Sequence, residues 1–189
     1  MRRFIALAVT AAAIAGCQQG AEQQPENESQ SAATNNATAT PEQRENAVAS
    51  AGIPTTPVAS RDVALKMMKA RHESYEEIGD AMKLIGRELK GDSPDLAAVR
   101  TASATIAGLA PKIPSWFPPG TGPDVGKTEA KAEIWQKPED FAVKAHAMNQ
   151  ATAAFNRTAQ GTDVAAIRAA HGDLAKTCKA CHDLYREEH

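Results

Sequence analysis

The sequence predicts an all-α protein, an antiparallel four-helix bundle with a long loop between helices two and three. Aromatic residues make up only 4% of the 189 residues and Ala is abundant, which disfavours a β-sandwich or barrel and favours helices. Four segments carry apolar residues at helical spacing. Two of the three connections between these segments are short, so the helices they join are expected to run antiparallel.

The first 16 residues are typical of an export signal. Met1-Arg2-Arg3 is basic and precedes an apolar stretch of about 12 residues, too short for a membrane-spanning helix of about 20. Small residues then precede Cys17, as in a bacterial lipobox, so we expect residues 1–16 to be a lipoprotein signal peptide and Cys17 to be lipidated. After an ordinary signal peptide, Cys17 would be a stray thiol. Gln18, by resemblance to the sorting rule of enteric bacteria, favours the outer membrane.

Residues 17–59 are predicted to form a disordered tether between the lipid and the folded domain. They are rich in Gln, Asn, Ser, Thr, Glu and Pro, and their apolar residues are almost all Ala without a helical or alternating pattern. Such a segment cannot bury enough surface to offset its ordering entropy. The remaining residues, 60–189, are enough for one modest core.

The first bundle helix is predicted from Arg61 to Lys90, and the second from Pro94 to Ala110. The seam of the first helix steps alternately by three and four residues along Met68, Arg71, Tyr75, Ile78, Met82, Ile85 and Leu89. We expect both methionines to be core residues. Ser93 is expected to cap the second helix, with Pro94 at its first position.

The long connection runs from Pro111 to Pro138, where Pro and Gly interrupt any sustained period. A loop of this length is unusual in a compact domain, which suggests that it has a role. The third helix is predicted from Pro138 to Gln160. Thr162 or Asp163 is expected to cap the fourth helix. The seam of this last helix contains Ile167, His171, Leu174, Cys178, Cys181 and Tyr185. We expect His171 to be buried and hydrogen-bonded.

The segment Cys178-Lys179-Ala180-Cys181-His182 is the attachment motif for c-type haem. Two thiols at i and i+3 on a helix suit addition to the two vinyl groups. The adjacent His182 can then place an imidazole nitrogen on the iron. We therefore expect one covalent haem c with His182 as its metal ligand. Only seven residues follow His182, so any second axial ligand must come from upstream.

Other interpretations of these cysteines remain open. A thioredoxin-like pair would need a strand–helix setting, which the pattern lacks. A zinc site would need a further ligand such as His171 or His189. A disulfide between Cys178 and Cys181 in an exported chain would instead give a haem-free lipoprotein adaptor.

Three segments resemble class II c-type cytochromes, the cytochrome c′ family. They are residues 176–186 with the haem motif, residues 71–91 of the first helix, and the loop with Pro119-Gly120-Thr121 followed by residues 131–135. The resemblance covers about 60–189. It implies thioether links at Cys178 and Cys181, with His182 as the proximal ligand.

The resemblance also implies the surroundings of the haem. Arg186 would lie beside the proximal imidazole, which helix spacing also predicts. Arg71 and His72 would lie near the haem edge, where a propionate would pair with the otherwise costly buried charge of Arg71. The alternative for Arg71 is a side chain that extends from the edge of the bundle into water. Lys131 and Glu133 would also approach the haem.

The sixth coordination site depends on Tyr75. The resemblance implies that a methionine four residues after Arg71 makes a low-spin electron carrier, whereas a bulky non-ligand leaves the iron five-coordinate. Here the residue is Tyr75, which we interpret as a packing residue rather than a phenolate ligand.

These observations predict a periplasmic, lipid-anchored haem protein that transfers electrons or binds small gases, nitric oxide and carbon monoxide, at a five-coordinate iron. A low-spin six-coordinate electron carrier is the alternative within haem proteins. The net charge of −2 gives no basic field for nucleic acid. The pattern shows no acid–base pair or nucleophile, so we expect no enzyme activity. The resemblance implies a homodimer, and the sequence does not identify the redox partner.

Overall fold

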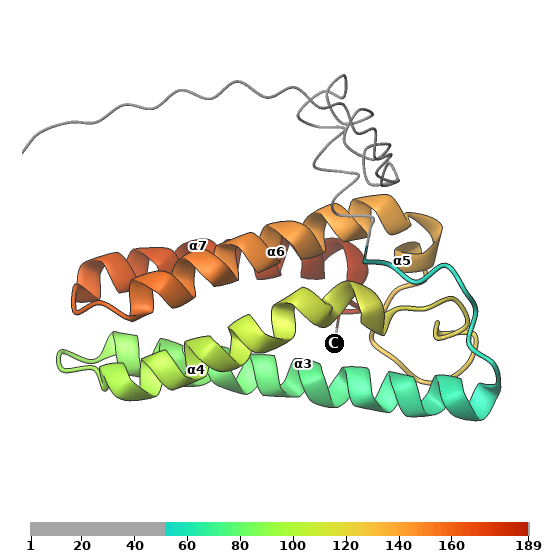
Figure 1. The fold of residues 1–189 in the computed structure, drawn as a ribbon, viewed down its shortest axis with the longest axis horizontal. Helices are drawn as coiled ribbons and strands as arrows, with labels where there is room; N and C mark the ends of the chain where they lie inside the picture. Colours follow the sequence, from blue (N-terminus) through green and yellow to red (C-terminus); the bar gives the residue numbers. More distant parts are fainter. Residues whose placement is uncertain (1–51, 189) are drawn as a thin grey trace, which may run out of the picture. The chain divides into compact units, whose positions relative to one another are not determined.

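The structure, a computed structural model, describes residues 52–188. Within them lie α3 (Arg61–Lys90), α4 (Leu96–Leu109), the 3₁₀ helix η2 (Ala110–Trp116), the short α5 (Glu133–Gln136), α6 (Pro138–Ala159) and α7 (Val164–Tyr185). Figure 1 shows α3 antiparallel to α4 and α6 antiparallel to α7, with α5 and the long loop at the end where α7 finishes. The predicted four-helix bundle is confirmed. The predicted signal peptide, Cys17 and residues up to 51 of the tether lie outside the described residues.

Capping side chains explain where the bundle helices begin. The hydroxyl of Ser60 accepts a hydrogen bond from the Val63 amide at 3.3 Å, and α3 has the predicted bounds. The prediction that Ser93 caps the second helix is wrong. The Asp95 carboxylate accepts from the amides of Ala97 and Ala98 at 2.9 and 3.0 Å, so α4 begins two residues later than predicted. One carboxylate oxygen satisfies two free amides there.

The long connection between α4 and α6 contains two short helical segments that the sequence pattern did not reveal. η2 continues directly from α4, with Pro111 near its start and Pro114 inside it. Proline removes the amide needed for α-helical hydrogen bonds, which favours a shorter turn in place of further α-helix. η2 and the residues after it pass over the end of the bundle, where they contact α3 and α6.

Residues 52–59, which we expected to belong to the tether, contact the bundle. The Val58 amide donates to the carbonyl of Pro119 at 3.1 Å. Ile53 is half-buried against the core. The segment therefore holds the long loop from outside, and apolar Ile53 and Val58 distinguish it from the polar residues that precede it.

Apolar side chains of all four long helices form one core. The large side chains with almost no exposure include Ile85, Ile106, Phe141, Phe155, Ile167 and Leu174. Met68 is buried and Met82 is half-buried against this core, as predicted. No helix in residues 52–188 is long and apolar enough to cross a membrane.

Two arginines close the end of the bundle away from the long loop. Arg168 of α7 donates to the carbonyls of Leu89 and Gly91 at 2.8 and 2.9 Å, at the end of α3. Arg100 of α4 makes the equivalent pair of bonds near the end of α6, at 3.1 and 2.9 Å. The last carbonyls of a helix have no partner within it and carry partial negative charge, so a guanidinium satisfies them. We call these four bonds the arginine clamps.

His171 on α7 is an exception to the expected hydrogen bonding. Its Nε2 is buried and has no hydrogen-bond partner among the described residues, and the same holds for the Thr152 hydroxyl on α6. Its ring lies 5.8 Å from the ring of Phe155, and Gly86 leaves space for it on α3. The predicted hydrogen bond of His171 is therefore not found. Burial lowers its pKa.

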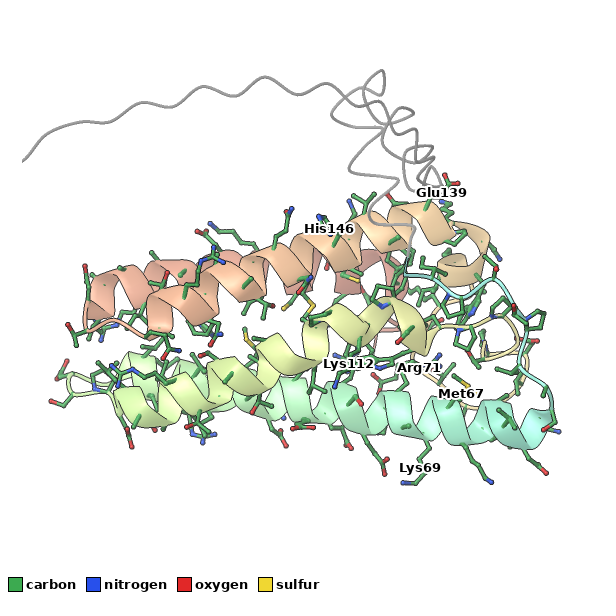
Figure 2. The ribbon with its side chains drawn as sticks, viewed as in Figure 1. Met67, Lys69, Arg71, Lys112, Glu139 and His146 are labelled. Atoms are coloured by element: carbon green, nitrogen blue, oxygen red, sulfur yellow. The ribbon has the colours of Figure 1, made fainter. Side chains whose placement is uncertain are left out.

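His171 should make the fold acid-sensitive. Because its folded-state pKa lies below its unfolded value of about 6.5, the unfolded state binds more protons, and stability falls as the pH drops through 6.5. The free energy of unfolding, measured with denaturant, should fall more between pH 7 and pH 5 for the wild-type protein than for His171→Leu. His146, on the outer side of α6 (Figure 2), provides the matched control His146→Leu. An equal loss in His171→Leu and wild type would contradict this prediction.

Candidate functional site

The thiols of Cys178 and Cys181 lie on one face of α7, half-buried against the core. The i, i+3 spacing places them one above the other. Both are free thiols. Burial raises the pKa of both, and that of Cys181 to about 11, so both stay protonated near neutral pH. The structure therefore presents two adjacent neutral thiols without the disulfide of the adaptor interpretation.

His182 follows on the exposed side of the same turn. Partial burial lowers its pKa, and the charge of Arg186 lowers it further. A neutral imidazole is the form that binds iron. The described residues contain no group of three or more His, Cys, Asp or Glu able to hold a metal ion, which argues against the zinc interpretation with His171. His189 lies outside the described residues.

The long loop holds the end of α7 in place. Ala130 and Arg186 form an antiparallel bridge, and the Lys131 amide donates to the carbonyl of Tyr185 at 3.0 Å. The Arg186 amide also donates to the carbonyl of His182 at 3.1 Å. These bonds fix the turn that carries His182.

Side chains add two further links at this end. The guanidinium of Arg186 pairs with Glu129, with Nε 2.8 Å from a carboxylate oxygen. The hydroxyl of Tyr185 donates a short hydrogen bond to Asp140, in the first turn of α6. Burial and this bond raise the pKa of Tyr185. The short helix α5, which begins at Glu133, contacts α7.

Arg71 is buried, with 4% of its surface exposed, and points from α3 toward the long loop (Figure 2). It donates to the carbonyl of Trp116 at 3.3 Å and to the carbonyl of Thr121 at 3.2 Å. It also donates to the hydroxyls of Thr121 and Thr128 at 3.3 and 3.1 Å. The alternative in which Arg71 extends into water is therefore excluded.

Carbonyl and hydroxyl dipoles and two aromatic rings stabilise the buried charge of Arg71. Its guanidinium carbon lies 4.6 Å from the ring centroid of Phe117 and 5.7 Å from that of Trp135. Every hydrogen bond that it makes to a described residue goes to a neutral oxygen. Burial lowers its pKa to about 10, which leaves it protonated at neutral pH. A buried cation held in this way suits an additional anionic group, such as a haem propionate.

Tyr75 lies one turn after Arg71 on α3 and, like Cys178 and Cys181, is half-buried against the core. Its ring is packed edge-on against Trp116, with 5.2 Å between centroids, and tilted against Phe117 at 6.3 Å. Burial raises its pKa, and so does the proximity of Cys181. The phenolate form is disfavoured in this environment, which argues against Tyr75 as an anionic ligand.

The structure thus brings Arg71 and Tyr75 to the same end of the bundle as Cys178, Cys181 and His182. His72 does not join them: it is exposed on α3, with Nε2 3.5 Å from Glu76. Lys131 contributes its backbone hydrogen bond to Tyr185, and Glu133 begins the helix α5, which contacts α7. Side chains that the sequence did not identify as part of the site are Trp116, Phe117, Thr128, Glu129, Asp140 and Tyr185. The aromatic residues that the sequence places in and near the long loop could have indicated some of these side chains.

The comparisons with known proteins agree with this geometry. A family model described as cytochrome C′ matches residues 66–186. The chain is 34% identical over 117 residues to the cytochrome c′ of Pararhodospirillum photometricum, covering 62% of this chain and 93% of that one.

Two solved structures are similar over most of their lengths. One, a cytochrome c′ with ligand-controlled dimer dissociation, has a TM-score of 0.62 and 29% identity, covering 66% of this chain and 97% of that chain. The other is a nitric oxide complex of a variant cytochrome c′ from Alcaligenes xylosoxidans. It has a TM-score of 0.60 and 27% identity, covering 70% of this chain and 99% of that chain.

Proposed function

Because this chain belongs to the cytochrome c′ family, whose members carry one covalent haem c, we propose that it is an exported protein with a five-coordinate iron. The family membership supports haem-based electron transfer or gas binding. The nitric oxide complex of a relative favours a diatomic gas as ligand. The position of Tyr75 is the single observation that carries the five-coordinate assignment.

We propose that Cys178 and Cys181 form the two thioether links and that His182 is the proximal ligand. When bound, the haem supplies a one-electron couple and an iron site open to a diatomic gas. Arg71 would bind a propionate while it holds the long loop. Arg186, fixed by Glu129, would keep a positive charge beside His182.

Tyr75 would exclude water and other ligands from the distal face. The ring of Tyr75 packs against those of Trp116 and Phe117, so displacement of Tyr75 requires rearrangement of its neighbours. Gas binding is therefore expected to be slow. The described part of α3 places no methionine at this position, which argues against the low-spin alternative.

The absorption spectrum of the purified holoprotein tests this assignment. We expect high-spin, five-coordinate features in both the ferric and ferrous states, and a shift when carbon monoxide is added to the ferrous protein. A reduced-minus-oxidised spectrum should also show one c-type haem. Native low-spin bands in both states would refute the open site and favour the electron-carrier alternative.

We also propose that the protein is anchored through lipid on Cys17 and faces the periplasm, with the outer membrane favoured. The sequence of residues 1–18 supports this proposal. A homodimer is proposed by likeness to the relative whose dimer dissociation is ligand-controlled.

Cys17→Ser should release the protein from membranes without loss of haem. Cys17 and the haem motif lie in separate parts of the chain, so we expect unlipidated protein that still carries haem. Membrane fractionation and mass spectrometry of the N-terminus measure both properties. Wild-type protein that is wholly soluble, with an N-terminus other than Cys17, would contradict the lipoprotein assignment.

A further inference from the structure

Most aromatic residues of the chain form one connected cluster at the haem-motif end of the bundle. The sequence has two Trp, two Tyr and four Phe. Both Trp, both Tyr and two of the Phe contact one another in this cluster. The aromatic cluster consists of Tyr75, Trp116, Phe117, Trp135, Phe141 and Tyr185.

The two tyrosines lie at different places in this cluster and are joined through two phenylalanines. Tyr75 lies 6.3 Å from Phe117, measured between ring centroids. Phe117 lies 4.7 Å from Phe141, which lies 5.4 Å from Tyr185. Tyr75, Cys178 and Cys181 are half-buried against the core that contains Tyr185. The ring contacts therefore form a continuous path between the two tyrosines in the same core against which the haem-attachment turn packs.

Two features distinguish Tyr185 from the other oxidisable rings. Its hydroxyl donates to Asp140, a built-in proton acceptor, whereas the Tyr75 hydroxyl has no acceptor among the described residues. The Arg71 cation lies over the rings of Phe117 and Trp135, where a further positive charge is disfavoured. These features favour Tyr185 over Tyr75 and Trp135 as the site of a one-electron oxidation.

We propose that Tyr185 is a redox-active tyrosine that supplies one electron when a hydroperoxide oxidises the haem centre, with Asp140 accepting its phenolic proton. This inference rests on the proposed function, because peroxide must reach an open iron. It adds a role for two residues, Tyr185 and Asp140, which the gas-binding function does not use. The result would be protection of the haem against oxidative damage.

Reduction of the hydroperoxide consumes two electrons and two protons, and it gives water together with an alcohol, or a second water from hydrogen peroxide. One electron would come from the haem centre and the other from Tyr185 through the aromatic cluster, and solvent would supply both protons. The Tyr185 proton passes to the Asp140 carboxylate, which leaves a neutral phenoxyl radical. Two electrons from an external donor then restore the haem centre and the phenol, and Asp140 returns the proton to Tyr185.

The test uses the holoprotein mixed with one equivalent of hydrogen peroxide, freeze-quenched and examined by electron paramagnetic resonance. Wild type should give a tyrosyl radical, identified by the narrowing that ring-deuterated tyrosine causes. The chain has only two tyrosines, so loss of the signal in Tyr185→Phe assigns the radical to Tyr185. Tyr185→Phe should lower the yield of the signal at least tenfold relative to wild type with the same haem content.

Asp140→Asn tests the proton acceptor. Asn retains an oxygen that can accept the Tyr185 hydrogen bond but is a far weaker base, so the radical yield should also fall at least tenfold. Tyr185→Phe should in addition bleach its haem faster under excess peroxide than wild type. A signal retained in Tyr185→Phe would overturn the assignment to Tyr185, and an unchanged yield in Asp140→Asn would overturn the role of Asp140.

The haem content and spin state of each sample separate this inference from the proposed function. Wild type that has lost haem or shows a low-spin iron refutes the proposed function. Wild type with an intact five-coordinate haem that consumes peroxide but gives no tyrosyl radical refutes this inference alone.

Discussion

Replacing Cys178 and Cys181 together by Ala should abolish covalent haem attachment. The two thiols are adjacent on one face of α7 and are free, and each would supply one thioether bond. Mass spectrometry after acid-acetone extraction should show one haem mass on the wild-type chain and none on the double variant. Each single variant should retain a single link and a shifted absorption band.

Ala180→Ser is the matched control, because it changes an exposed residue within the same motif without removing a thiol. It should keep the full haem mass. A double variant that retains the haem mass, or a haem-loaded wild-type chain that loses it to acid-acetone, would contradict the assignment of the two cysteines.

Tyr75→Ala should speed the association of carbon monoxide with the ferrous protein by about tenfold or more. The ring of Tyr75 is held by Trp116 and Phe117, and a ligand must push it aside to reach the distal face. Removing a barrier contribution of about 1.4 kcal/mol gives a tenfold rate increase. Flash photolysis or stopped-flow mixing measures the rate.

Two further substitutions separate the effects of ring size and ligand chemistry. Tyr75→Phe keeps the ring and removes the hydroxyl, so its rate should remain near that of wild type. Tyr75→Met introduces a thioether that can bind iron and should give a low-spin spectrum. An association rate in Tyr75→Ala as slow as that of wild type would show that this side chain does not limit access.

The four-helix bundle could be predicted from the sequence because its helices carry apolar residues at regular helical spacing. The interval from Met68 to Leu89 keeps one helical period, and α3 has the predicted bounds. Local chemistry was harder to predict. Ser93 and Asp95 are both good caps, and only the backbone geometry selects Asp95. The hydrogen bonding of His171 depends on its neighbours in other helices, which periodicity does not show.

The site was predictable where one motif or one helix defines it, and not where the long loop contributes. Cys178, Cys181 and His182 are contiguous in a motif, and Tyr75 follows Arg71 by one helical turn. Thr128 and Glu129 are distant in sequence from the arginines they contact, and no pattern in the loop gives those pairings. The family resemblance implied that His72 lies near the haem edge with Arg71, but adjacent residues on a helix face different directions.

The arginine clamps join the two helical hairpins of the bundle at their turns. Arg168 of α7 bonds to the carbonyls of Leu89 and Gly91 at the end of α3, and Arg100 of α4 bonds to those of Ala159 and Gly161 at the end of α6. Each hairpin therefore satisfies the last carbonyls of a helix in the other hairpin. Loss of either guanidinium would leave two carbonyls without these partners, so the clamps link the α3–α4 and α6–α7 hairpins through polar bonds as well as through the shared core.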